Sequence, residues 1–211
     1  MNDMHLRNFV LVAAFALMIG ACDSAPPANS SPEIKKGVQP VADSEIAVIE
    51  MENAAAFGTI KIELYSNIAP KMVERFKELA REGLYDGTDF HRINQSVIQG
   101  GDPNSKDDDP SNDGQGRSQK PSVPAEFSDI EYTAGIVGAA RSPDPNSANS
   151  QFFITLKRES GFDTRYTVFG KVIDGMNHVM TISGVQPKMG EQPVEPVRIK
   201  SVRIEPAGEN K

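Results

Sequence analysis

Three stretches of the sequence combine a guanidinium, side-chain amides and aromatic rings at short spacings. They run from Phe90 to Asp102, from Asp144 to Ile154 and from Tyr166 to Val172. A guanidinium presents five N–H donors in a fixed plane and does not give up its charge. Beside an apolar surface, such a group can stabilise a lone pair or a carbonyl oxygen on a bound molecule. Such a group could therefore act on a bound molecule by electrostatic stabilisation.

Other kinds of active site find little support in the sequence. A Ser-His-Asp hydrolase would need a nucleophile elbow, and no such pattern is present. The stretch 109–120 begins like an EF-hand calcium loop, but Lys120 stands where a bidentate glutamate is required. His91 and His178 do not have the spacing of zinc ligands. We therefore expect neither a metal nor another cofactor.

The three stretches resemble the signature blocks of the cyclophilins, in the same order and at similar separations. The blocks are Phe90-His91-Arg92-Ile93 leading to Gln99-Gly100-Gly101-Asp102, Asp144-Pro145-Asn146-Ser147 leading to Ser150-Gln151-Phe152-Phe153-Ile154, and Tyr166-Thr167-Val168-Phe169-Gly170-Lys171-Val172. The likeness covers roughly residues 46–205. It implies a mainly β fold, a closed antiparallel eight-stranded barrel capped by two helices. It also implies a peptidyl-prolyl cis/trans isomerase that binds proline-containing polypeptides.

Rotation about an X-Pro bond suits a site of this kind. Amide resonance sets a barrier of ~18–20 kcal/mol, and the unassisted reaction is slow. Because no covalent bond changes, a catalyst needs only to stabilise the twisted imide better than the planar forms. The nitrogen of the twisted imide regains a lone pair, which a guanidinium can stabilise while an apolar pocket excludes water.

The resemblance also gives individual residues their roles. It implies that Arg92 is the catalytic guanidinium, that Gln99 orients it and that Phe153 forms the floor of the proline pocket. The other expected substrate-binding residues are Gln151 at the rim, Phe162 and Tyr166 in the lining, and Ala140 with the backbone of Arg141 along the strand that holds the peptide. For His91 a structural role and a direct substrate contact both stay open, and we favour the structural role because rotation requires no net proton transfer.

One wall of the expected pocket departs from the family pattern. The stretch between Ile93 and Gln99 is one residue shorter than is usual, and Ser96 and Val97 fall where large pocket residues are typical. We therefore expect a shallower wall. This departure favours the alternative function, a non-catalytic binding module or chaperone for proline-bearing segments, whereas the presence of Arg92 opposes it.

Hydrophobic periodicity predicts the elements that would position these residues. Period-two alternation predicts a strand over Thr59–Leu64. Pro70 at a first helical position and Gly83 as a stop predict a helix between them. A second helix is expected over Met176–Ile182. Further strands are expected at 46–51, 89–93, 97–99, 135–140, 151–156, 167–172 and 197–205.

The first 44 residues are expected to lie outside the fold. Residues 1–21 resemble a lipoprotein signal peptide, because the apolar run Phe9–Ile19 is too short to span a bilayer and precedes a lipobox-like Ile19-Gly20-Ala21-Cys22. This likeness predicts lipidation of Cys22, and an ordinary signal peptide cut near Ala21 is the alternative. Residues 22–44, rich in Ala, Pro and Ser, are predicted to form a flexible tether.

These segments suggest a domain plan and a location. The isomerase domain is predicted to span residues 45–207, followed by a tail at 208–211. A lipid on Cys22 would anchor it in the cell envelope on the periplasmic face, and Asp23 favours the inner membrane.

Composition narrows the partners further. The net charge of -7 without a basic stripe argues against nucleic acid, and a single cysteine excludes an internal disulfide. We expect a monomer that binds proline-containing polypeptides.

Overall fold

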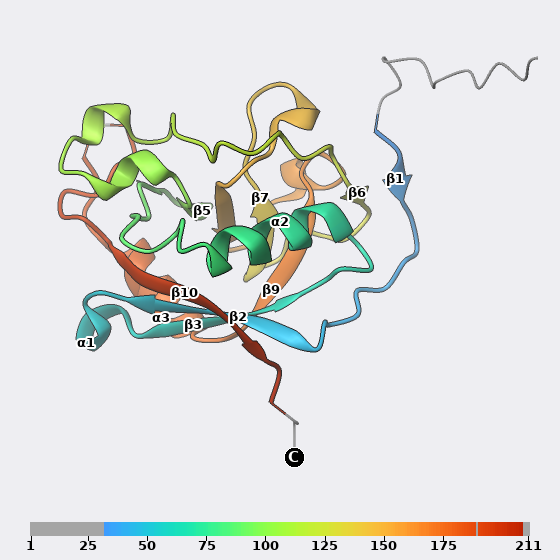
Figure 1. Ribbon diagram of the computed structural model, residues 1–211, viewed down its shortest axis with the longest axis horizontal. Coiled ribbons are helices and arrows are strands. Elements are labelled where there is room, and N and C mark those ends of the chain that lie inside the picture. The colour runs from blue at the N-terminus through green and yellow to red at the C-terminus, as the bar shows by residue number, and fades with distance from the viewer. Residues whose placement is uncertain (1–31, 189, 209–211) are drawn as a thin grey trace, which may run out of the picture. The chain divides into compact units, whose positions relative to one another are not determined.

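The computed structural model describes residues 32–188 and 190–208 (Figure 1). Their main feature is an antiparallel sheet with the strand order β10-β2-β3-β9-β7-β8-β5-β4. The strands are β2 (Glu45–Met51), β3 (Thr59–Leu64), β4 (Arg92–Ile93), β5 (Val97–Gly100), β7 (Ile136–Ala139), β8 (Phe152–Thr155), β9 (Val168–Asp174) and β10 (Ile199–Pro206). The predicted signal peptide and Cys22 lie outside the described residues.

The remaining elements are short. Two-residue strands β1 (Ile34–Lys35) and β6 (Phe127–Ser128) pair in parallel. The α-helices are α1 (Ala54–Phe57), α2 (Pro70–Arg81) and α3 (Met176–Ser183), and 3-10 turns span Pro103–Lys106, Pro110–Asn112, Pro145–Ser147 and Ser160–Phe162. No helix in the described part of the chain has the length and apolarity to cross a membrane.

The eight-stranded sheet is open, so the prediction of a closed barrel is wrong. Its two edge strands are β10 and β4. Backbone hydrogen bonds do link the segment before β4 with the start of β10 and the residues just before it, with Phe90 N donating to Val197 O at 3.0 Å and Ile199 N to Thr88 O at 2.8 Å. Because β4 has only two residues, this contact amounts to one isolated bridge and not to a closing ladder.

The longer predicted elements are present with shifted ends. The strand at Thr59–Leu64 and the helix that starts at Pro70 match the prediction, whereas the strand expected at 89–93 keeps only its last two residues. Neither α1 nor the β1–β6 pair was predicted. Each is too short to produce a periodic pattern.

Helix α2 packs its apolar face on the sheet because its hydrophobic residues recur at helical spacing. Phe76 lies at the centre, with ring centroids 5.1 Å from Tyr85, 5.4 Å from Phe152 and 5.3 Å from Phe169. Burying one such side chain contributes ~1.5–3 kcal/mol. The buried residues of the helix are Met72, Val73, Phe76, Leu79 and Ala80.

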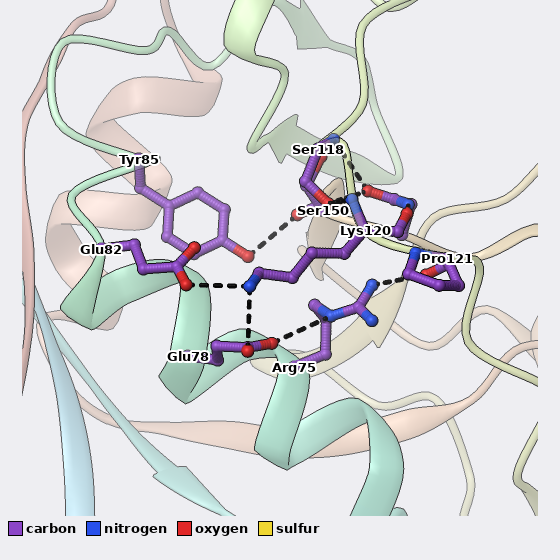
Figure 2. Close-up of polar contacts among 9 residues, drawn as sticks. Arg75, Glu78, Glu82, Tyr85, Ser118, Lys120, Pro121 and Ser150 are labelled. Atoms are coloured by element: carbon purple, nitrogen blue, oxygen red, sulfur yellow. Dashed lines mark hydrogen bonds and ion pairs between the residues drawn. The ribbon is translucent and has the colours of Figure 1, made fainter.

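The opposite face of α2 binds the loop that leads towards β6 (Figure 2). Lys120 Nζ lies 2.9 Å from Glu78 Oε1 and 2.8 Å from Glu82 Oε1, and Arg75 Nη1 donates to Pro121 O at 2.7 Å. Each of these exposed ion pairs by itself contributes little to stability. Together these contacts fix a loop whose neighbouring carbonyl groups reach the candidate site.

Residues 32–44 pack against the domain, so the flexible tether predicted for 22–44 is wrong for this part. Lys35 Nζ donates to Ile68 O at 2.7 Å, and Val41 N donates to Asn67 Oδ1 at 3.0 Å. The segment buries little apolar surface, as its composition indicates, but polar contacts hold it in place. We call residues 32–44 the N-terminal strap.

Asp43 is the strap's main attachment. Its carboxylate accepts hydrogen bonds from Lys77 Nζ at 2.6 Å, Ser66 Oγ at 2.7 Å and Ser66 N at 3.1 Å. Burial opposes ionisation of Asp43, but the bonds from Lys77 and Ser66 outweigh it and hold the pKa of the carboxyl below its ordinary value. The ionised form therefore stabilises the folded state.

The substitution Asp43→Asn tests this attachment. Because the pKa of Asp43 is lower in the folded state, its contribution is complete above the unfolded pKa of 3.8 and is lost as the pH falls through the folded pKa. We expect the variant to lose roughly 1–3 kcal/mol of unfolding free energy at neutral pH, and less as the pH falls below that range. Urea unfolding of residues 32–211 measures both values.

The control is Asp174→Asn, which breaks a pair with Lys61 in which the aspartate side chain is 65% exposed. We expect it to change stability by less than ~0.5 kcal/mol. An equal effect of the two substitutions at neutral pH would contradict the anchoring role of Asp43.

Candidate active site

Arg92 and Gln99 face each other across the β4–β5 hairpin. They are direct partners in the antiparallel ladder, and Arg92 Nη1 donates to Gln99 Oε1 at 3.2 Å. The turn between the strands is closed by Asn94, whose Oδ1 accepts from Ser96 N at 2.8 Å and Val97 N at 2.9 Å. This side-chain cap lets the shortened stretch form a compact turn.

The same register continues into the next two strands. Gln99 is the ladder partner of Phe153 on β8, and Phe153 is the partner of Gly138 on β7. Residues directly opposite one another project to the same face of a sheet. Arg92, Gln99, Phe153 and Gly138 therefore form one cross-strand row, and the side chains of the first three share one face.

A chain of side-chain amides runs beside this row. Gln99 Nε2 donates to Gln151 Oε1 at 2.9 Å. Gln151 Nε2 in turn donates to Gly116 O at 2.9 Å and to Gly114 O at 3.0 Å, both in the loop held by α2. The orientation of Gln99, and through it that of Arg92, is thus linked to the loop across the surface.

Arg92 has a second partner that the sequence did not suggest. Its Nε lies 2.6 Å from Glu191 Oε2, and Asn94 Nδ2 donates to the same oxygen at 3.1 Å. Burial opposes ionisation of Glu191, but the bonds from Asn94 and Arg92 outweigh it and lower the pKa of the carboxyl. Glu191 is 99 positions from Arg92 in the chain, so no local pattern could have indicated this contact.

An aromatic cluster surrounds Phe153. Its ring centroid lies 5.7 Å from Tyr132 and 5.5 Å from both Phe162 and Tyr166. Phe153 is only 4% exposed, whereas Phe162 and Tyr166 are partly exposed. Val97, which stands in the wall that was expected to be shallow, belongs to the buried part of this cluster. The cluster comprises Tyr65, Ile68, Val97, Tyr132, Ile136, Phe153 and Val168, flanked by Ile130, Ala140, Phe162 and Tyr166.

Phe152 and Gly138 show how the neighbouring strand positions leave room for this cluster. Phe152 points to the opposite side and packs with Phe76, as the alternation of side chains in a strand requires. A Cβ at Gly138 would lie 2.4 Å from Phe153 Cζ and 2.6 Å from Tyr132 Oη, so only glycine leaves room for these rings. Neither Tyr132 nor Gly138 was predicted as part of the site, since neither lies in the three blocks.

A groove of about 300 Å³ adjoins the row, and it holds four of the predicted site residues. Gln99, Gln151, Ala140 and Arg141 line it together with the loop at Gly116. Arg141 is fixed by its own surroundings, with Cζ 4.6 Å from the centre of the Tyr166 ring and Nη2 bonded to Arg165 O at 2.8 Å. Arg92, Phe153, Phe162 and Tyr166 are not among the residues that line this groove.

His91 is not among the residues that line this groove. It immediately precedes β4 and borders a separate cavity of about 150 Å³ near Asp89 and Asp113. Its side chain is buried, and neither ring nitrogen has a hydrogen-bond partner among the described residues. Burial lowers the pKa of His91, which favours the neutral imidazole.

Comparison with known proteins agrees with this geometry. The family model "Cyclophilin type peptidyl-prolyl cis-trans isomerase/CLD" matches residues 48–204. A "Probable peptidyl-prolyl cis-trans isomerase" of Brucella suis is 38% identical over 180 residues, which cover 82% of this chain and 83% of that protein. The peptidyl-prolyl cis-trans isomerase ppi1 of Schizosaccharomyces pombe is 38% identical over 156 residues, which cover 71% of this chain and 94% of the relative.

A solved structure supports the same assignment. A cyclophilin-type peptidyl-prolyl cis-trans isomerase of Cryptosporidium parvum, crystallised in the presence of the dipeptide Ala-Pro, superposes with a TM-score of 0.68 and 28% identity. The match covers 77% of this chain and 99% of that structure. The sequence match, the relatives and the fold agree: this chain belongs to the cyclophilin family and is a peptidyl-prolyl cis/trans isomerase.

Proposed function

We propose that the chain accelerates rotation about X-Pro bonds in exported proteins, with Arg92 as the group that stabilises the twisted imide. The observation that carries this proposal is the cross-strand row, which sets the guanidinium and the aromatic ring of Phe153 on one face of the sheet. A prolyl ring seated against Phe153, Phe162 and Tyr166 would bring its imide nitrogen towards Arg92.

The bonding of Arg92 leaves it able to act in this way. Among the described residues its side chain donates to Glu191 through Nε and to Gln99 through Nη1. The remaining N–H groups of the guanidinium are then available to a ligand. A donor that is already oriented stabilises the twisted imide without reorganising during the reaction.

His91 does not take part in proton transfer in this proposal. Rotation moves no proton, and burial lowers the pKa of His91, which favours the neutral imidazole. His91 instead borders the cavity beside the Asp-rich loop, where it lies near Gly114. This placement supports the structural role over a direct substrate contact.

The substitution Arg92→Ala tests the central role. We expect kcat/KM for a proline-containing peptide to fall by at least ~10²-fold, by analogy with the loss of one oriented donor. Exchange NMR or a protease-coupled assay on the folded variant measures this. Arg203→Ala is the matched control, because Arg203 also pairs with a carboxylate at 2.6 Å and is 47% exposed where Arg92 is 43% exposed.

The same assay distinguishes the alternative, a binding module or chaperone without catalysis. Near-normal activity of folded Arg92→Ala would refute the role of Arg92. Peptide binding by the unaltered protein without faster interconversion would favour the binding module instead.

We further propose that the protein is a lipoprotein of the cell envelope. The support is the lipobox-like Ile19-Gly20-Ala21-Cys22 behind a short apolar run. Two or more acyl chains on Cys22 would hold it stably at a bilayer, where a single chain binds only marginally. Asp23 favours the inner membrane, with the domain on the periplasmic face and acting as a monomer.

The substitution Cys22→Ser tests the anchor. We expect the protein to move from the membrane fraction to the soluble fraction, and mass spectrometry to show an acylated N-terminal cysteine only in the unaltered protein. Ser24→Ala is the control and should remain at the membrane. A mature protein with an unmodified Cys22 would indicate an ordinary signal peptide instead.

A further inference from the structure

We infer that Glu191 is a positioning residue for the isomerase reaction, one that holds Arg92 so that its Nη edge faces the prolyl ring. The inference rests on the proposed role of Arg92 and extends it to a residue outside the three sequence blocks. Glu191 does not touch the substrate in this account. It acts through the guanidinium.

The position of the contact on the guanidinium is the first argument. Glu191 Oε2 lies 2.6 Å from Nε of Arg92. Nε carries a single N–H, so this contact does not occupy the N–H groups of the two terminal nitrogens. Gln99 accepts from Nη1. Two fixed acceptors on a planar group set both its position and its plane, and they leave the rest of the Nη edge free among the described contacts.

The carboxylate of Glu191 is itself held in place. Asn94 Nδ2 donates to the oxygen that contacts Arg92, at 3.1 Å, and Ile93 N donates to the backbone oxygen of Glu191 at 2.7 Å. The side chain and the backbone of Glu191 are therefore both bonded to the hairpin that carries Arg92. The lowered pKa of Glu191 keeps this carboxyl charged at neutral pH.

The backbone of Glu191 shows that this placement has a conformational cost. Its φ of 71° lies in the left-handed region, which residues other than glycine rarely adopt. The turn is fixed by a bridge between Pro187 and Pro193 and by Gln192 Nε2, which donates to Pro110 O at 2.6 Å. Strained backbone that the surroundings hold in place is typical of functional sites.

Stability alone does not account for this arrangement. The Arg92 and Glu191 side chains are 43% and 44% exposed, and ion pairs at such positions contribute little to folding. Glycine would fit the observed φ better than glutamate does. A carboxylate at this position therefore serves the orientation of Arg92 more than it serves the fold.

The substitution Glu191→Gly separates the effect of Glu191 on stability from its effect on catalysis, because the two are expected to change in opposite directions. Glycine relieves the positive φ, so we expect unfolding free energy to be unchanged or higher. The guanidinium loses its Nε acceptor, so we expect kcat to fall by about tenfold with a smaller change in KM. Kinetics and urea unfolding of the full chain in detergent measure both quantities.

Two further variants complete the test. Glu191→Gln keeps an acceptor oxygen without the charge, and we expect a kcat between those of the unaltered protein and Glu191→Gly. Glu195→Ala is the control, since Glu195 is exposed on the same segment and makes no ion pair among the described residues. The Nε–H resonance of Arg92 should be protected from solvent exchange in the unaltered protein and lose this protection in Glu191→Gly.

The outcomes separate this inference from the proposed function. If Arg92→Ala is inactive but Glu191→Gly keeps full or higher kcat, the positioning role is refuted while the function stands. Equal losses in Glu191→Gly and Glu191→Gln would also refute it. If the unaltered protein does not accelerate isomerisation, the proposed role of Arg92 fails first.

Discussion

The antiparallel register across β4, β5, β8 and β7 is the constraint on which the rest of this surface depends. It places Arg92, Gln99, Phe153 and Gly138 in one row. A slip by one residue would turn each of these side chains to the other face. Backbone pairing alone thus brings the charged and apolar parts of the site onto one face of the sheet.

Around this row, distant segments fix side chains that the strands alone would leave mobile. The loop held by α2 supplies the carbonyl groups that bind Gln151, and Gln151 holds Gln99. Glu191 approaches from the turn that precedes β10 and binds Arg92 from the other side. The guanidinium is therefore oriented from two parts of the chain that do not belong to its own hairpin, which is what stabilisation of a twisted imide by a fixed donor requires.

Much of this could be predicted from the sequence, and the exceptions have physical reasons. Hydrophobic periodicity predicts helix α2 and strand β3. The resemblance to the cyclophilin signature blocks points to Arg92, Gln99 and Phe153 as site residues. Whether the sheet is open or closed depends on whether its edge strands β4 and β10 pair with each other. Local sequence patterns do not determine this pairing. Tyr132 and Glu191 act through contacts between segments far apart in the chain, and the N-terminal strap is held by polar contacts that composition does not reveal.

A crystal structure of residues 32–211 with a bound Ala-Pro peptide tests the central claim most directly. The account predicts the prolyl ring against Phe153, with an Nη atom of Arg92 within ~3 Å of the prolyl carbonyl oxygen or nitrogen. A peptide whose proline lies away from Phe153, or an Arg92 guanidinium turned from the bound imide, would contradict it.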